Sequence, residues 1–259
     1  NRDWTWLTQK ETSQRMKIYN SWMPHIHVDY HEQNFDEPYY FAPAARPYHN
    51  QITSWQRELQ KIIGKNHARY FDKNNWLYFT KEHFDLLYPG YGDTYPIYNG
   101  AIGMTYEKAG GGSGGISVAT SDGDTLTLRS RIKHHHITGL STVESAYKHK
   151  DRIIKEFKYF FKKGLDNPIS KYKTFVIKAE LNDSKREDLL RWLDSHGIEY
   201  GRPKDDRARS IRGLSYFLDE NVSFRIEEND IIISADQKKS VFTQVLFEPK
   251  THYEDSLTY

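Results

Sequence analysis

The chain has 259 residues, enough for one large domain or for a domain with a smaller companion. Its 37 Lys and Arg residues against 35 Asp and Glu give a net charge of only +2, which predicts no general attraction to nucleic acid or to an anionic membrane. The absence of cysteine excludes disulfides and thiolate metal sites, so any metal must be bound by His, Asp or Glu. No apolar run is long enough to form an integral membrane segment.

The first predicted elements are a helix and a strand with one polar face. A capping box at residues 8–11 predicts the start of the helix. In residues 25–31, three histidines and Asp29 alternate with apolar side chains, which is the period of a β-strand. His31 stands where this strand is expected to end. The pattern indicates either a metal or catalytic site or a solvated strand face whose histidines have no function.

The following elements alternate in the manner of an α/β domain. Residues 51–70 have the apolar period of a helix, and residues 85–96 are rich in Gly, Pro and Tyr, as in a loop. The apolar run 101–106 predicts a buried strand that ends on Glu107. The glycine-rich residues 110–115 lack the Lys-Ser/Thr of a phosphate loop, so we expect a flexible segment there and not a nucleotide site.

Two predicted strands therefore deliver an ionisable side chain at their carboxyl ends, His31 and Glu107. Open α/β sheets place their ligand sites at this edge. A carboxylate is seldom left at the end of a buried strand without a partner or a function. A glutamate beside a metal-bound water is a natural general base, so the two positions together predict a hydrolytic site.

Three short motifs carry a family resemblance. The motifs are Asn1-Arg2-Asp3-Trp4, then Val28-Asp29-Tyr30-His31-Glu32, then Met104-Thr105-Tyr106-Glu107. In order and approximate spacing they resemble the second half of the catalytic domain of zinc carboxypeptidases of the carboxypeptidase A type. The resemblance covers roughly residues 1–147.

The resemblance implies a role for each matching position. His31 would be a ligand of the zinc ion, and Glu107 would be the catalytic general base. Asp29, on the same strand face as His31, could orient that ligand. Asn1 and Arg2 would bind the free C-terminal carboxylate of a peptide substrate. Tyr88 and Tyr91 are the candidates for the tyrosine that closes over the substrate.

The chain also departs from the family pattern. The first two zinc ligands of the family come from a His-x-x-Glu motif upstream of the Asn-Arg pair, and this chain begins at that pair. The motif His196-Gly197-Ile198-Glu199 has the spacing, but Gly197 is expected to end a helix there, which favours coincidence. We therefore expect either the C-terminal part of a larger enzyme or a relative that has lost its metal.

Two further segments have weaker functional readings. The consecutive residues His134, His135 and His136 would bind metal adventitiously if exposed, but they do not converge on one ion in a helix or strand. Residues 148–163 form a basic amphipathic pattern, which is typical of a solvated helix docked on its domain and, less often, of a helix that binds membranes or polyanions.

The last third of the chain predicts a separate small unit. We expect a strand at 174–177, a helix opened by a capping box at 184–187, a basic loop at 202–212, and a hairpin over 223–234 that turns near 228–230. This part has no concentration of catalytic residue types, so it is interpreted as an accessory domain.

The sequence thus predicts an α/β fold: a carboxypeptidase-like mixed sheet flanked by helices at 1–165, followed by a small α+β domain at 171–259. The predicted function is a periplasmic or secreted, zinc-dependent metallocarboxypeptidase-type hydrolase with one zinc ion, which cleaves C-terminal residues from peptides and binds no nucleic acid. The alternatives are a non-catalytic peptide-binding relative, and an amidase or deacylase acting on cell-wall peptides or modified amino acids.

Overall fold

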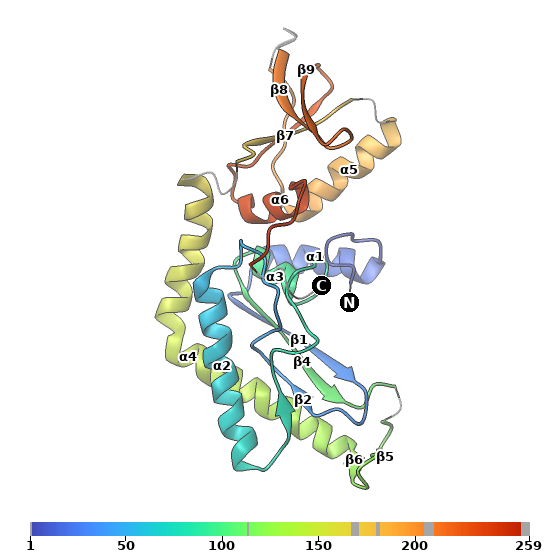
Figure 1. Ribbon diagram of the computed structural model, residues 1–259, viewed down its shortest axis with the longest axis vertical. Helices are drawn as coiled ribbons and strands as arrows, with labels where there is room; N and C mark the ends of the chain where they lie inside the picture. The colour runs from blue at the N-terminus through green and yellow to red at the C-terminus, as the bar shows by residue number, and fades with distance from the viewer. Residues whose placement is uncertain (1, 113, 167–170, 180–181, 205–209, 255–259) are drawn as a thin grey trace. The chain divides into compact units, whose positions relative to one another are not determined.

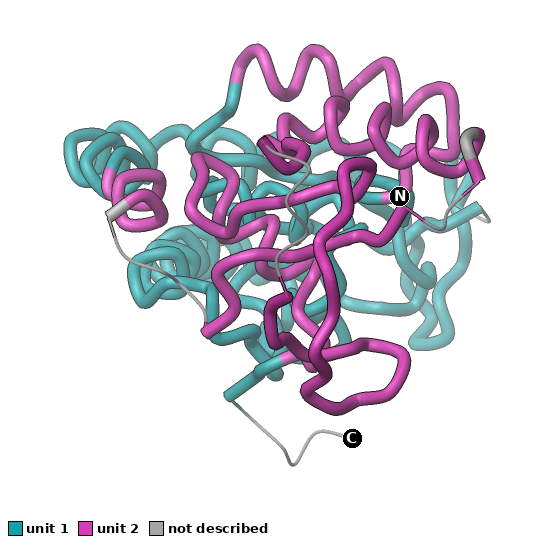
Figure 2. Tube along the Cα trace, turned by 90° about the horizontal axis from the view of Figure 1, so that it is seen from above, with its two compact units in different colours: residues 1–5, 23–158, 252–259 teal, residues 6–22, 159–251 magenta. Residues whose placement is uncertain are grey.

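The computed structural model is of the mixed α/β class and describes residues 2–112, 114–166, 171–179, 182–204 and 210–254. Its contacts divide the chain into two compact units (Figure 2): unit 1 comprises 1–5, 23–158 and 252–259, and unit 2 comprises 6–22 and 159–251. This division differs from the predicted 1–165 and 171–259 chiefly in its assignment of residues 6–22 to the second unit.

Unit 1 is built on a four-stranded mixed sheet with the order β1-β4-β2-β3 (Figure 1). Its strands are β1 (Ile26–Gln33), β2 (Tyr39–Tyr40), β3 (Tyr78–Phe79) and β4 (Ile102–Ala109). β1 and β4 are parallel, while β2 is antiparallel to β4 and parallel to β3. The two predicted strands are therefore neighbours, although each continues two residues beyond the ionisable side chain that was expected to end it.

Three helices and a small hairpin complete this unit: α2 (Ser54–Lys73), α3 (Thr94–Tyr98), the first part of α4 (Leu128–Asp166), and the paired strands β5 (Ser117–Ala119) and β6 (Thr125–Thr127). The helix predicted at 51–70 is confirmed as α2, which opens with a capping box between Thr53 and Gln56. The helix predicted at 148–163 lies within α4, which begins twenty residues earlier and contains the three consecutive histidines.

The hydrophobic core explains which face of the sheet is free for a site. Ile102, Met104 and Tyr106 of β4 are buried in a cluster with the apolar face of α2 and with Ile153 of α4. Because side chains alternate along a strand, Thr105 and Glu107 point to the opposite face of the sheet. The sequence pattern of β4 thus separates a packed face from a face that carries polar groups.

Unit 2 contains the helices α1 (Lys10–Trp22), α5 (Asp183–His196) and α6 (Ser240–Phe247) and the strands β7 (Thr174–Ile177), β8 (Ser210–Ser215), β9 (Glu220–Arg225) and β10 (Ile231–Ser234). The predicted strand at 174–177 is confirmed as β7, and the predicted helix is α5, although its N-cap is Asn182 and not the expected Ser184. Gly197 ends α5 with a left-handed backbone, as predicted.

The hairpin predicted over 223–234 is wrong. β9 pairs with β8 and β10 pairs with β7, both antiparallel, so the strands on either side of the expected turn belong to different two-stranded sheets. The reason lies in Asp230, whose buried carboxylate accepts hydrogen bonds from Lys178 Nζ and from the backbone N–H of Ala179. These bonds attach the start of β10 to the end of β7.

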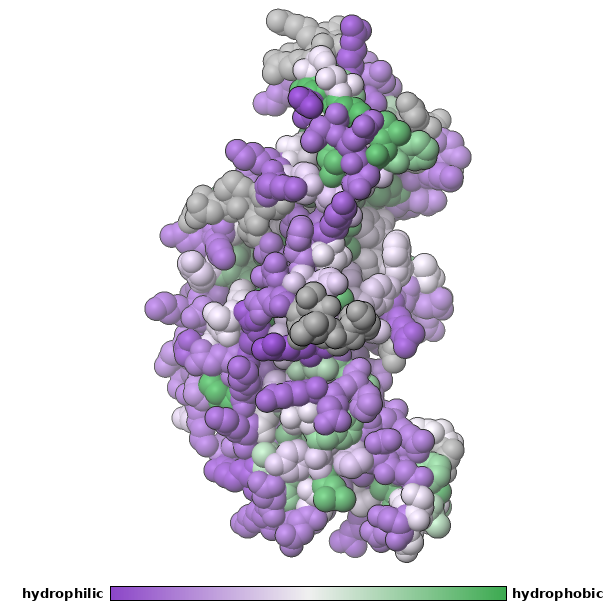
Figure 3. Space-filling model, in the orientation of Figure 1, coloured by the Kyte–Doolittle hydropathy of each residue, from purple (hydrophilic) through white to green (hydrophobic). Residues whose placement is uncertain are grey.

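No helix within the described ranges combines the length and the apolar composition that a membrane crossing requires. The face of the molecule drawn in Figure 3 is mostly hydrophilic, with hydrophobic side chains in separate patches.

Candidate functional site

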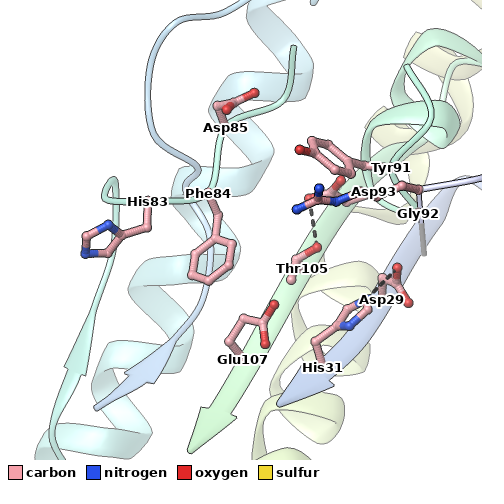
Figure 4. A pocket seen from close by; sticks show the side chains of 11 residues that line it. Asp29, His31, His83, Phe84, Asp85, Tyr91, Gly92, Asp93, Thr105 and Glu107 are labelled. Carbon is pink, nitrogen blue, oxygen red and sulfur yellow. Dashed lines mark hydrogen bonds and ion pairs between the residues drawn. The ribbon is translucent and has the colours of Figure 1, made fainter. Parts of the chain in front are cut away.

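Unit 1 contains a pocket of about 220 Å³ on the polar face of the sheet. Its walls come from the chain start, from β1 and β4, and from the segment that precedes α3 (Figure 4). The lining residues are Arg2, Asp29, His31, His83, Phe84, Asp85, Tyr91, Gly92, Asp93, Thr105 and Glu107. Among them are four of the six residues that the sequence assigned to the site.

The parallel register of β1 and β4 sets the geometry of the pocket floor. His31 is directly opposite Glu107, and Asp29 is directly opposite Thr105. All four side chains lie on the same face because their positions differ by two along each strand. Figure 4 shows Glu107 and His31 side by side, with Asp29 next to His31 and the ring of His83 turned away from them.

Asp29 orients the His31 imidazole. Its Oδ2 lies 2.8 Å from His31 Nε2, and both side chains are partly exposed to the pocket. The hydrogen bond that His31 donates to Asp29 is the main reason that the pKa of His31 is raised above its ordinary value, and burial opposes this effect. With Nε2 engaged by Asp29, Nδ1 is the ring nitrogen left to face a ligand. The contact expected between these two residues is present.

Glu107 is a carboxylate in a dehydrated setting. The residue is only 7 % exposed, and its Oε2 has no hydrogen-bond partner among the described residues. Burial raises the pKa of Glu107 to about 7, while the positive charge of His31 acts in the opposite direction. A glutamate with this pKa exchanges its proton near neutral pH, which is the property required of a general base.

The segment before α3 brings a second buried carboxylate to the pocket. Asp93 accepts a hydrogen bond from Thr105 Oγ1 at 2.8 Å and one from Thr94 Oγ1 at 3.0 Å. Burial raises its pKa to about 6. This close approach depends on glycine, because a Cβ at Gly103 would lie 1.7 Å from the Asp93 carbonyl oxygen, and one at Gly92 would lie 1.9 Å from Asp29 Oδ2.

The residues assigned to substrate binding are only partly brought together. Arg2 and Tyr91 both line the pocket, and the Arg2 guanidinium lies 5.8 Å from the centre of the Tyr91 ring. Tyr88 does not line the pocket; its hydroxyl lies 3.4 Å from the Arg2 carbonyl oxygen and its ring packs edge-on against Tyr91. Asn1 lies outside the described residues.

The described residues do not by themselves form a complete zinc site. No group of three His, Cys, Asp or Glu side chains within these residues is arranged to hold a metal ion. In the downstream motif, His196 is fully buried against the rings of Trp192 and Phe242, which confirms that its spacing to Glu199 is coincidental. His31 is thus one candidate ligand without two companions.

Two of the three consecutive histidines have packing roles. His134 is buried, with its ring centre 4.2 Å from that of Trp76, and His135 Nδ1 lies 2.8 Å from the hydroxyl of Tyr39. Burial lowers the pKa of both, to about 3 for His134 and to about 4 for His135. They therefore remain neutral at pH 7, inside the face of the sheet that α4 covers.

Sequence reasoning missed six residues that line the pocket, namely His83, Phe84, Asp85, Gly92, Asp93 and Thr105. A signal existed for Thr105, because it stands two positions before Glu107 and so shares its strand face. The two aspartates come from a loop whose path the sequence pattern does not specify.

Comparison of this chain with protein-family models, with curated proteins and with solved structures gave no match.

Proposed function

We propose that this pocket belongs to a zinc-dependent hydrolase of the metallocarboxypeptidase type, which removes C-terminal residues from peptides in the periplasm or outside the cell. The observation that carries the proposal is the pairing of His31 and Glu107 across two parallel strands, in a pocket that Arg2 also lines. A candidate metal ligand, a candidate general base and a candidate carboxylate-binding group thus share one cavity.

Arg2 is suited to the substrate's free carboxylate. Its planar guanidinium can donate two parallel hydrogen bonds to the two carboxylate oxygens, a geometry that lysine cannot supply. Tyr91 beside it provides an aromatic wall for the last residue of the peptide.

Glu107 would take the proton of the attacking water. Glu107 lines the pocket, so a water molecule bound there could give up a proton to its carboxylate. As the water attacks the carbonyl carbon, the proton moves to Glu107 and can then pass to the leaving amine. The pKa of about 7 suits both transfers.

The donor set fits a zinc ion in part. His31 could bind it through Nδ1, with Asp29 holding Nε2, as is usual for histidine ligands of metals. A catalytic zinc site has three protein ligands, so two more would have to come from outside the described residues. When bound, zinc supplies Lewis-acid chemistry that lowers the pKa of a water molecule to about 7.

The proposal is tested by peptide hydrolysis together with zinc analysis. In the zinc-loaded protein, Glu107→Gln is expected to lower the rate of C-terminal residue release at least about 100-fold, with the zinc content unchanged. His31→Ala is expected to reduce the zinc content itself. A Glu107→Gln protein that keeps the parent rate would remove Glu107 from the mechanism. Equal hydrolysis of amidated or N-acylated substrates would indicate an amidase or deacylase instead.

A second candidate function is peptide binding without catalysis. The observation that favours it is the incomplete set of metal ligands in the described ranges. This candidate predicts that peptides with a free C-terminus bind in the pocket but are not cleaved at any zinc concentration.

A further inference from the structure

We propose that the outward face of α4 is a docking surface for a partner protein, which binds there through an amphipathic helix whose apolar side is bordered by acidic residues. The surface lies in the part of α4 that belongs to unit 1. It shares no residue with the pocket, so the inference stands apart from the proposed function.

The first observation is a line of exposed apolar side chains on α4. Five residues, each between 43 % and 72 % exposed, form this line, which we call the α4 seam: Ile132, Leu140, Val143, Tyr147 and Ile154. At 3.6 residues per turn they fall within an arc of about 80° and extend over about 33 Å of the helix. The last four have the spacing of a and d positions in a heptad repeat, which is typical of a contact between two helices.

The inward side of the same helix is already packed. Figure 1 shows α4 beside α2, and Asn66 Nδ2 of α2 donates a hydrogen bond to Ser141 Oγ of α4 at 2.8 Å. Thr138 and Ser145 are buried, and Ile153 belongs to the core cluster of unit 1. These contacts hold α4 on its domain without the seam. The seam residues are therefore available to a partner, and removing them from water would favour its binding.

The second observation is the charge beside the seam. Between residues 128 and 158, the helical period places four cations and one carboxylate in the arc or within about 20° of it. These five residues, all exposed, are Arg129, Lys133, Lys150, Lys158 and Asp151. Lys150 Nζ lies 4.7 Å from the centre of the Tyr147 ring, so its charge stands at the seam itself. Acidic residues on a partner helix would complement this charge, as residues at e and g positions do in coiled coils.

Width and charge discriminate among the possible occupants. A second copy of the chain would bring four more cations against the first four, and like charges in close contact lower affinity. A helix that lies on an anionic membrane buries a broad apolar face, whereas a narrow stripe is typical of a coiled-coil contact. The α4 seam is narrow and has Lys133 and Lys150 on its two sides. A partner helix with acidic flanks fits both features.

The test measures the binding of three designed four-heptad peptides to the full chain by fluorescence anisotropy. The first peptide has leucine at its a and d positions and glutamate at e and g. The second has lysine at e and g, and the third is the first with its leucines reordered so that no heptad repeat remains. The first is expected to bind roughly tenfold more tightly than either of the others. Equal affinity for the first peptide and for either of the others would overturn the inference.

Two matched variants assign the binding to the seam. Leu140→Gln replaces a seam residue that is 53 % exposed, and Leu218→Gln replaces a residue of unit 2 that is 54 % exposed. Leu140→Gln is expected to weaken binding of the first peptide roughly tenfold, whereas Leu218→Gln should keep the parent affinity. Because glutamine is a good helix former, circular dichroism should show the parent helix content in Leu140→Gln. Equal affinities of the two variants would place the binding elsewhere and overturn the inference.

Two measurements on the chain without peptide test the other occupants. Analytical ultracentrifugation is expected to show no self-association that depends on Leu140, and vesicles that contain phosphatidylserine are expected to leave the chain in solution. A dimer that Leu140→Gln dissociates would identify a second copy as the occupant. Vesicle binding that Leu140→Gln abolishes would identify a membrane surface. Either result would overturn the inference.

Discussion

His31 and Glu107 are directly opposite one another in the parallel register of β1 and β4, and both side chains line one pocket. Each belongs to a different strand, 76 positions apart in the sequence, and the register alone makes them neighbours. Their charges act on each other, because the carboxylate contributes to the raised pKa of the histidine and the histidine restrains the rise in the pKa of the glutamate. This pair is the structural basis of the proposed hydrolytic function.

The first prediction concerns the hydrogen bond between Asp29 and His31. Asp29→Asn is expected to lower the pKa of His31, because that hydrogen bond is the largest cause of its elevation. An NMR titration that follows the ring protons of His31 measures the change. Asp36→Asn, at an exposed turn outside the pocket, is the matched control and should leave the His31 titration where it was. An unchanged curve in Asp29→Asn would mean that the contact is absent in solution.

The second prediction concerns the close approach of the pocket loop to β4. Gly103→Ala is expected to lower the free energy of unfolding by about 1–3 kcal/mol, because the added Cβ would lie 1.7 Å from the backbone oxygen of Asp93. At Gly201 an added Cβ meets nothing within 4 Å, so Gly201→Ala should change the stability by less than about 0.5 kcal/mol. Urea unfolding measures the free energy of unfolding of both variants. Equal losses in Gly103→Ala and Gly201→Ala would contradict the close packing of Gly103 against Asp93.

The third prediction concerns acid stability. The pKa of His134 is lowered to about 3 by burial, so below pH 6.5 the unfolded chain binds a proton that the folded chain does not. Neutral His134 therefore makes its full contribution to the free energy of unfolding above about pH 6.5. This contribution is lost as the pH falls from about 6.5 toward 3. Glu107 and Asp93 act in the opposite sense, since their pKa values are raised and protonation favours the folded state.

A substitution isolates the histidine contribution. His134→Phe keeps an aromatic ring against Trp76 and removes the site that binds the proton. Between pH 7 and pH 5, the free energy of unfolding of this variant should therefore fall less than that of the parent, and the difference should reach up to about 2 kcal/mol. His136→Phe replaces the exposed neighbour on the same helix and is the matched control for the added phenyl ring. The readout is the free energy of unfolding in urea at each pH. Parallel curves for His134→Phe and the parent would show that His134 is already protonated in the folded state.

The sequence predicted the local elements of the site better than the tertiary arrangement. The period-two pattern of residues 25–31 and the apolar run 101–106 were sufficient to place His31 and Glu107 on strands, and the structure confirms that those strands are adjacent. Helix α2 was predicted from its apolar face, which is a local signal, and the structure confirms it. The carboxypeptidase-like character of the sheet remains part of the proposal.

What the sequence did not predict depends on contacts between distant segments. Asp93 reaches the pocket only because Gly103 allows the backbone before α3 to touch β4. The hairpin expected near residue 229 was wrong because the side chain of Asp230 accepts a hydrogen bond from the backbone N–H of Ala179, which follows β7 and lies 51 residues earlier in the chain. Turn residues alone do not reveal which strand will be the partner.

The most direct test of the proposed function is a binding measurement with two peptides that differ only in amidation of the C-terminus. We predict that the free acid binds at least tenfold more tightly than the amide, because a charge-assisted hydrogen bond of the Arg2 guanidinium contributes about 1.5–3 kcal/mol. Arg2→Ala is expected to abolish the difference. Equal affinities for the two peptides in the parent chain would contradict the assignment of this pocket to peptide C-termini.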